Sequence, residues 1–329
     1  MPRSKHSPAQ QNPDSHNSNQ SSTQSNTKNI GLALGSGSAR GWAHIGVIQT
    51  LEEIGIKPDI VCGTSIGALV GGMYATHNLE KLHQWLLTLD KKEILKFLDV
   101  SLLTRGGFIE GKILIDFFNK HMGTHLIEDL SISFASIATD LSNGQEVWIK
   151  EGSIHDAIRS SMALPGLFTP VEQDNTWLVD GGLVNPVPVS TCRAMGASKV
   201  IAVNLNGDIL GKHLNNHNSQ SRNKFSKLTE KTVLSRFTNT LTGKAGSLFS
   251  DLFENNTNQP GIFDVLASSI NIMQDRITRS RMAGDPPDII LSPKLAHIGL
   301  MEFDRAEEAI EAGRKAVLQL RPTLEDLFN

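Results

Sequence analysis

The stretch DIVCGTSIGALVGGMYA, residues 59–75, decides the fold that we expect for this chain. Asp59–Cys62 is a short apolar run that predicts a buried strand, and Ile66–Ala75 predicts a helix rich in small residues. Between them lies a G-x-S-x-G motif, Gly63-Thr64-Ser65-Ile66-Gly67, on a strand-to-helix turn. Such a turn lifts a serine hydroxyl clear of the sheet, and the N-terminus of the following helix favours developing negative charge. The motif therefore indicates a nucleophile at Ser65; the alternative is a glycine-rich turn whose serine only caps the helix.

The alternation of short apolar runs and helix-period segments continues outward from this stretch. Strand–helix alternation of this kind predicts an α/β fold, a three-layer sandwich with a central, mostly parallel sheet. Further strands are expected at Ile30–Leu34, Ser133–Thr139, Glu146–Ile149, Thr176–Val179, Lys199–Asn204 and Asp288–Leu291, and further helices at Trp42–Ile54, Phe263–Met282 and Asp304–Leu320.

Shifts in composition divide the chain. Residues 1–28 are rich in Ser, Asn, Gln and Pro and have almost nothing to bury, which predicts a disordered tail. Residues 29–329 predict one folded domain, with a polar insertion or lid at about 206–260. For the helix at Phe263–Met282, packing on the core is favoured over a role at a membrane surface, because its basic residues cluster only at its end.

Charge and cysteine content exclude several classes of function. A net charge of −3 does not supply the basic field that nucleic-acid binding usually needs. The two cysteines, Cys62 and Cys192, are typical of reduced thiols in a cytoplasmic protein, and the sequence offers no metal-ligand spacing. The N-terminus does not resemble a secretory signal, and no stretch approaches the roughly 20 apolar residues of a membrane span. We expect a cytoplasmic protein without metal, cofactor or nucleic-acid partner; the sequence specifies no oligomeric state.

A second glycine-rich turn, Gly35-Ser36-Gly37-Ser38-Ala39-Arg40-Gly41, follows the first predicted strand. Because such a turn presents free backbone N–H groups, it suits a dinucleotide-phosphate cradle, an oxyanion hole or a plain tight turn. The dinucleotide hypothesis is weak, since Arg40 stands where a third glycine is needed and the expected acidic residue, Glu52 or Glu53, lies inside a helix. An oxyanion hole fits better, because two such turns on adjacent strands face each other at one sheet edge. There Arg40 either holds the loop or adds positive charge nearby.

Asp180 is the candidate base. It follows the strand Thr176–Val179 and precedes Gly181 and Gly182, so its carboxylate lies in a tight turn that can approach another loop. An ordinary Asp-Gly turn is the alternative. A serine nucleophile needs a base to take its proton, and Asp180 supplies a carboxylate for that purpose.

The histidines offer no clear third member of a triad. His213 and His217 lie in the polar insertion, and His297 lies in a short loop. His44 and His77 flank the two glycine-rich turns, where we expect them to be structural or exposed helix residues. The residues thus favour a Ser65–Asp180 dyad, and a triad with His297 is the competing hypothesis.

The three motifs in this order resemble the patatin-like phospholipases, and in particular the bacterial RssA-type branch related to the catalytic domain of neuropathy target esterase. The likeness covers about 29–206 and resumes from about 286 to the last helix. The strings that carry it are GLALGSGSARGWAHIGVIQTLEEIGI (31–56), CGTSIGALVGGMYA (62–75), ATDLSNGQEV (138–147), SMALPGLFTPV (161–171) and LVDGGLVNPVPV (178–189).

This resemblance implies a hydrolase that cleaves lipid acyl esters without a catalytic histidine. By position, Ser65 is then the nucleophile and Asp180 the base, with an oxyanion hole at Gly37 and Ser38, flanked by Gly35 and Arg40. Family members often have an unbroken glycine run in this loop, whereas Ser36 and Ser38 interrupt it here. A positive φ at either serine would add strain of about 1–3 kcal/mol. The remaining motif glycines are Gly41, Gly63, Gly67, Gly181 and Gly182.

Three functions compete at this point. The first is an active lipid-acyl esterase that forms an acyl-enzyme, with phospholipid or lysophospholipid as substrate. The second is a regulatory or lipid-binding protein of the same fold with little turnover, because an intact motif set is not a rate. The third is a Ser-His-Asp carboxylesterase. A lipid substrate is compatible with peripheral contact at the inner face of the membrane.

Overall fold

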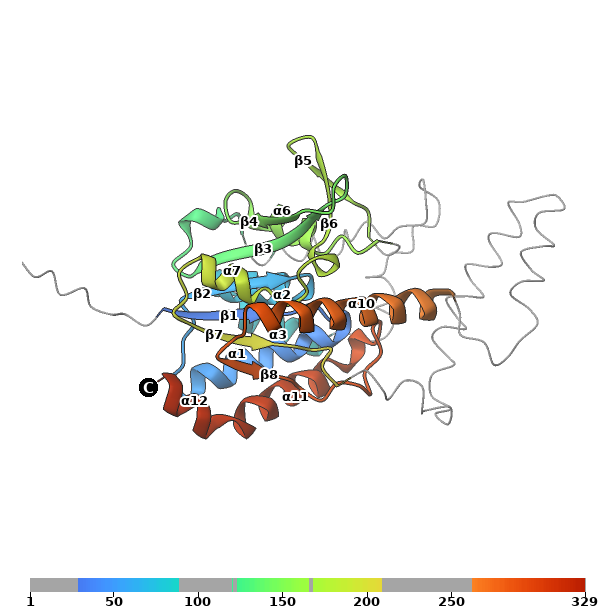
Figure 1. The fold of residues 1–329 in the computed structure, drawn as a ribbon. Coiled ribbons are helices and arrows are strands. Elements are labelled where there is room, and N and C mark those ends of the chain that lie inside the picture. The colour runs from blue at the N-terminus through green and yellow to red at the C-terminus, as the bar shows by residue number, and fades with distance from the viewer. Residues whose placement is uncertain (1–28, 89–119, 121–122, 166–167, 209–261, 329) are drawn as a thin grey trace, which may run out of the picture.

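The computed structural model describes residues 29–88, 120, 123–165, 168–208 and 262–328 (Figure 1). The predicted tail, 1–28, lies outside the described residues, and so does 209–261, which is most of the predicted insertion. Within the described part of the chain, no helix is long and apolar enough to cross a bilayer.

The described residues form an eight-stranded sheet, whose hydrogen-bonded order is β5-β6-β3-β2-β1-β7-β8, with β4 also paired to β3. The five strands from β3 to β8 in this order run parallel, and β4, β5 and β6 are antiparallel to their partners. The predicted α/β class with a mostly parallel sheet is therefore confirmed. The strands are β1 Ile30–Leu34, β2 Ile60–Thr64, β3 Ser133–Asp140, β4 Glu146–Ile149, β5 Val171–Gln173, β6 Thr176–Asp180, β7 Lys199–Val203 and β8 Ile289–Leu291.

Two strands meet end to end beside β3. β2 pairs with β3 up to Thr64, which lies opposite Ile137, and β6 ends at Asp180, which lies opposite Ala138. Both strands use the same edge of β3, because β4 pairs with residues 136–139 and so occupies the other edge. The residue that follows β2 is therefore brought next to the last residue of β6.

Helices cover both faces of the sheet (Figure 1). One face carries α1, α2, α3, α6, α11 and α12, and the other carries α7 and the end of α10. This is the predicted three-layer arrangement. The helices are α1 Ala43–Glu53, α2 Ile66–Ala75, α3 Leu79–Thr88, α6 Ile154–Ser161, α7 Val189–Ala194, α10 Ile262–Gly284, α11 Ala306–Gln319 and α12 Arg321–Phe328, with a 3-10 helix η1 at Ser38–Trp42 and another, η3, at Gly181–Leu183.

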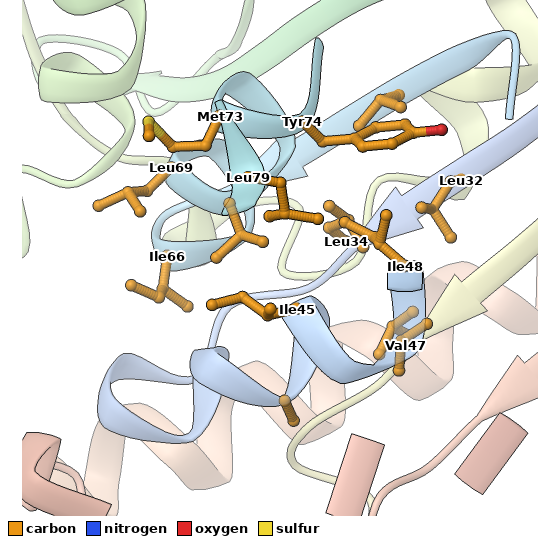
Figure 2. Close-up of a cluster of buried hydrophobic side chains, with 14 of the residues drawn as sticks. Leu32, Leu34, Ile45, Val47, Ile48, Ile66, Leu69, Met73, Tyr74 and Leu79 are labelled. Carbon is orange, nitrogen blue, oxygen red and sulfur yellow. The ribbon is translucent and has the colours of Figure 1, made fainter. Parts of the chain in front are cut away.

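The larger core lies between β1 and the helices α1 and α2. Figure 2 shows Leu32 of β1 and Ile48 of α1 on one side of this cluster and Leu69 and Met73 of α2 on the other. All four side chains are fully buried. Burial of a Leu, Ile or Met side chain contributes about 1.5–3 kcal/mol, so this cluster anchors the two helices that begin beside the glycine-rich turns.

Helices α1 and α11 pack with their backbones almost in contact. A Cβ on Gly46 would lie 1.9 Å from the Ile310 carbonyl oxygen, and a Cβ on Gly313 would lie 2.0 Å from that of Ala43. Both distances are far below van der Waals contact. The two helices can therefore lie this close only because Gly46 and Gly313 have no Cβ atom.

The structure differs from the sequence-based expectation at α10. This helix buries polar side chains, namely Asn271, Gln274, Asp275 and Thr278, whereas Ile272 and Met273 are each 49% exposed. This part of the helix is therefore packed on the protein, as expected, but through a polar face that the sequence did not predict. The sequence patterns also missed β5, α3, α6, α7 and α12.

Candidate active site

Ser65 and Asp180 form a direct hydrogen bond. The Ser65 hydroxyl donates to Asp180 Oδ2 at 2.6 Å, across 115 positions of sequence. The end-to-end arrangement of β2 and β6 explains the contact, because it aligns Ser65 with the residue opposite Ala138. The second carboxylate oxygen, Oδ1, accepts the Gly182 amide at 2.7 Å. The two residues that the sequence singled out are thus adjacent.

Ser65 occupies a strained backbone position. Its φ is 57°, a value that costs a non-glycine residue about 1–3 kcal/mol, and its surroundings hold it there. The Ser65 amide donates to the Ser161 hydroxyl at 2.8 Å, and Ser161 donates to the Ile137 carbonyl at 2.6 Å. Sequence reasoning missed this role of Ser161; the only signal was its place in the string SMALPGLFTPV.

The Asp180 carboxylate is almost completely shielded, with 1% of the residue exposed. Burial raises its pKa from 3.8 to about 6, although the hydrogen bonds from Ser65 and Gly182 oppose the shift. The main chain around it is also fixed, since its amide donates to Ala163 O at 3.0 Å and its carbonyl accepts Thr139 Oγ1 at 2.9 Å. A carboxylate with a raised pKa is a better proton acceptor than a free one.

The loop from Gly35 to Gly41 leaves two amides available. The Gly35 amide donates to Val203 O, and the Ser36 amide donates to Pro186 O. Among the described residues, the amides of Gly37 and Ser38 donate to no other group. The loop adjoins the turn at Ser65, because a Cβ on Gly41 would lie 2.2 Å from Ile66, the residue after Ser65.

Ser38 has the strained backbone conformation that the sequence analysis considered for the serines of this loop. Its φ is 53°, in the left-handed region, where glycine would be easier to accommodate. Its hydroxyl donates to the Leu300 carbonyl at 2.7 Å, and the Ala39 amide donates to the same oxygen at 3.1 Å. These bonds from a distant segment hold Ser38 in its strained conformation.

Arg40 is buried beneath this loop, with 1% of the residue exposed. Its Nε donates to Gly37 O at 3.3 Å and its Nη2 donates to Asn271 Oδ1 at 3.1 Å. Burial lowers the pKa of Arg40 to about 10, and the charge of Asp208 opposes this shift. The Arg40 side chain therefore links the loop to α10, and both of these side-chain hydrogen bonds go to protein acceptors.

The motif glycines serve close packing. None of the seven lies in the left-handed region, and Gly37 is extended at φ 170°; the left-handed values in the two turns belong to Ser38 and Ser65. A Cβ at any of the seven would lie 2.2–2.7 Å from its nearest neighbour, which applies to Gly35, Gly37, Gly41, Gly63, Gly67, Gly181 and Gly182.

The histidines have partners elsewhere. His44 Nε2 is 2.7 Å from the Gly35 carbonyl, and burial lowers the pKa of this ring to about 4. His77 contacts the Ser131 hydroxyl at 3.1 Å, and His297 lies 3.5 Å from Glu308. His213 and His217 lie outside the described residues. His44 is thus a neutral support of the glycine-rich loop, which agrees with the structural role expected for it.

The amino-acid sequence of this chain is similar to that of known proteins. The family model "Patatin-like phospholipase" matches residues 32–193. An uncharacterised NTE family protein of Mycobacterium tuberculosis is 32% identical over 331 residues, an alignment that covers 90% of this chain and 92% of that protein. The chain belongs to the NTE family of patatin-like phospholipase proteins.

Two further similarities are more partial. Lysophospholipase NTE1 of Pyricularia oryzae is 28% identical over 314 residues, which is 91% of this NTE family chain and 19% of that protein. Among solved structures, VipD from Legionella pneumophila is 13% identical with a TM-score of 0.43, over 90% of this chain and 67% of that one.

Helix α10 lies outside the range that the family model matches in this NTE family chain. It nevertheless contacts the glycine-rich loop, since Gln274 Oε1 accepts the Ser36 hydroxyl at 3.0 Å. Sequence reasoning did not identify Asn271 or Gln274, because polar residues inside a predicted helix are usually exposed.

Proposed function

We propose that this chain is a serine hydrolase that cleaves acyl esters of lipids, phospholipid or lysophospholipid, with Ser65 as nucleophile and Asp180 as base. The observation that carries the proposal is the 2.6 Å hydrogen bond between the two side chains. Membership of the patatin-like phospholipase family supports a lipid hydrolase, and the name of the Pyricularia oryzae relative supports lysophospholipid as one substrate class.

The proposed reaction has two stages. In the first, Ser65 Oγ attacks the acyl carbonyl carbon while its proton passes to Asp180. The tetrahedral oxyanion accepts hydrogen bonds from the Gly37 and Ser38 amides, and its collapse expels the alcohol, which takes the proton from Asp180. In the second, water attacks the acyl-enzyme and gives a proton to Asp180; collapse releases the fatty acid, and Ser65 regains its proton. One oxyanion donor contributes about 3–4 kcal/mol to such a step.

The buried position of Asp180 predicts a pH dependence. The base must be ionised to accept the proton, and its pKa in the free protein is about 6. We expect kcat/KM to fall about tenfold per pH unit below that value and to level off above it. A pH–rate profile with a soluble ester checks this. An inflection near the ordinary carboxyl pKa of about 4 would show that Asp180 is not the titrating base.

Covalent labelling tests the nucleophile. Wild type should react with a fluorescent fluorophosphonate, and Ser65→Ala should not. Ser198→Ala is a matched control, because Ser198 precedes β7 at the other end of the sheet and its hydroxyl donates to Asn29 O. A wild-type chain that takes no label would favour the regulatory or lipid-binding alternative.

A lipid panel then tests the substrate class. Phospholipid and lysophospholipid vesicles are incubated with wild type and with Ser65→Ala, and released fatty acid is measured. Ser65-dependent release from either class supports the proposal, and binding to the vesicles in the same experiment tests the peripheral membrane contact that we propose for a cytoplasmic enzyme. Fatty-acid release that is equal for wild type and Ser65→Ala would contradict the proposed lipid hydrolysis.

Replacing His297 tests the competing triad. His297→Ala should retain activity in the same assay, because the His297 side chain lies 3.5 Å from Glu308 and not beside Ser65.

A further inference from the structure

Helix α10 packs a polar face against the proposed active site. Asn271, Gln274, Asp275 and Thr278 are at least nine-tenths buried, although Ile272 and Met273 on the same helix are half exposed. Burying polar side chains is unfavourable unless they form hydrogen bonds. Asn271 and Gln274, the two residues of this face nearest the glycine-rich loop, do form hydrogen bonds. Their partners are Arg40 and Ser36 of that loop and Asn206, which follows β7.

Gln274 contacts three of these segments. Its Oε1 accepts the Ser36 hydroxyl at 3.0 Å and the Asn206 amide nitrogen, Nδ2, at 3.1 Å. Its Nε2 lies against the turn that follows Asp180, because a Cβ on Gly182 would be 2.4 Å away. One side chain of α10 therefore spans the gap between the proposed oxyanion loop and the proposed base.

Asn271 acts on the loop through Arg40. Asn271 Oδ1 accepts Arg40 Nη2 at 3.1 Å, and Arg40 donates to Gly37 O from both its side-chain Nε and its backbone amide, each at 3.3 Å. Gly37 O and the Ser38 N–H belong to one planar peptide, so they point in opposite directions. A guanidinium that holds the carbonyl therefore fixes the direction of the Ser38 N–H.

We infer that Asn271 and Gln274 are positioning residues that hold the oxyanion loop in its binding orientation. The inference rests on the proposed function, since it assigns a purpose to that orientation. Stabilisation of a developing oxyanion depends on donors that are already aligned, so a loop free to rotate its peptides loses rate without losing ground-state binding. Ser38 makes this support necessary, because its φ of 53° is strained.

The test compares Asn271→Leu and Gln274→Leu with wild type on p-nitrophenyl butyrate. We expect kcat to fall about 10-fold to 100-fold in each, less than the loss of a whole donor, with KM within about twofold. Inhibition by a trifluoromethyl ketone, whose hemiketal oxyanion would use the same donors, should weaken by the same factor as kcat/KM. Asn271→Asp keeps the acceptor for Arg40 and should retain kcat to within about threefold.

Thr278→Val is the matched control, because Thr278 is buried on the same face of α10 and its hydroxyl has no hydrogen-bond partner among the described residues. Its kcat should equal that of wild type. Titration of active chains with the fluorophosphonate separates misfolding from misalignment, since kcat is then expressed per reactive Ser65.

The outcomes separate the two proposals. If the wild-type chain shows no Ser65-dependent hydrolysis, the proposed function is wrong, and this inference fails with it. An active wild type whose Leu variants keep full kcat per reactive chain overturns only the inference. The inference also fails if Asn271→Asp loses as much activity as Asn271→Leu.

Discussion

Replacing Asp180 with asparagine is expected to lower kcat about 10³-fold, because general-base catalysis contributes about 10²–10⁴-fold and the amide cannot take the Ser65 proton. The amide oxygen still accepts the Gly182 N–H that now bonds Oδ1 at 2.7 Å, so the turn should survive. The measurement is steady-state hydrolysis of a soluble ester, corrected for folded protein by circular dichroism. Hydrolysis near the wild-type rate in this variant would end the dyad hypothesis.

The same variant is expected to be more stable than wild type above pH 6. The pKa of Asp180 is 3.8 in the unfolded chain and about 6 in the folded one, so the folded state loses stability as pH rises between these values and carries the full penalty above the second. Two pKa units correspond to about 3 kcal/mol as an upper limit. Below the unfolded pKa both states are protonated and the penalty is absent.

Urea unfolding at about pH 3 and about pH 7 measures this change. We expect Asp180→Asn to raise the free energy of unfolding at the higher pH and to leave it nearly unchanged at the lower. Asp174→Asn is the control, because Asp174 is an exposed residue whose φ of 50° asparagine also tolerates. An equal gain at both pH values would show that the effect does not come from the buried charge.

The second large effect is expected at the contact between α1 and α11. Gly313→Ala places a methyl group 2.0 Å from the Ala43 carbonyl oxygen, and Gly46→Ala places one 1.9 Å from that of Ile310. Neither neighbour can move away as a flexible side chain would, because both are backbone atoms. The helices must separate, and we expect a loss of about 3 kcal/mol or more in the free energy of unfolding.

Gly284→Ala is the matched control for these variants. Gly284 is the last residue of α10, and a Cβ there meets no atom within 4 Å. Its thermal midpoint should stay close to that of wild type, whereas Gly46→Ala and Gly313→Ala should unfold at clearly lower temperature. Wild-type midpoints for both would mean that the helices can shift apart without cost.

The strands and helices that carry the motifs could be predicted because their signals are local. The bounds of β1, α2 and β4 agree with the predicted ones, since each is a short run of fixed periodicity beside a turn. Strand β5 was missed because its three residues contain too little periodicity. Helix α6 was missed because its apolar residues Ile154, Ala157 and Ile158, although they lie at helical spacing, belong to a helix of only eight residues. For α10 the sequence predicted a helix packed on the core but not that its buried residues are polar, since periodicity reports which residues are apolar and not what the helix packs against.

The sequence by itself determined the α/β class and the strand-to-helix turn at Ser65, because glycine spacing and apolar periodicity act within a few residues. It proposed Asp180 as the base and left a triad with His297 as the alternative. Only the tertiary structure decided the rest. It aligned β2 and β6 on one edge of β3, so that residues 115 positions apart share a hydrogen bond of 2.6 Å. It also buried Asp180 and placed Asn271 and Gln274 against the glycine-rich loop. Burial and long-range pairing depend on every segment that packs around a residue, and no local pattern encodes them.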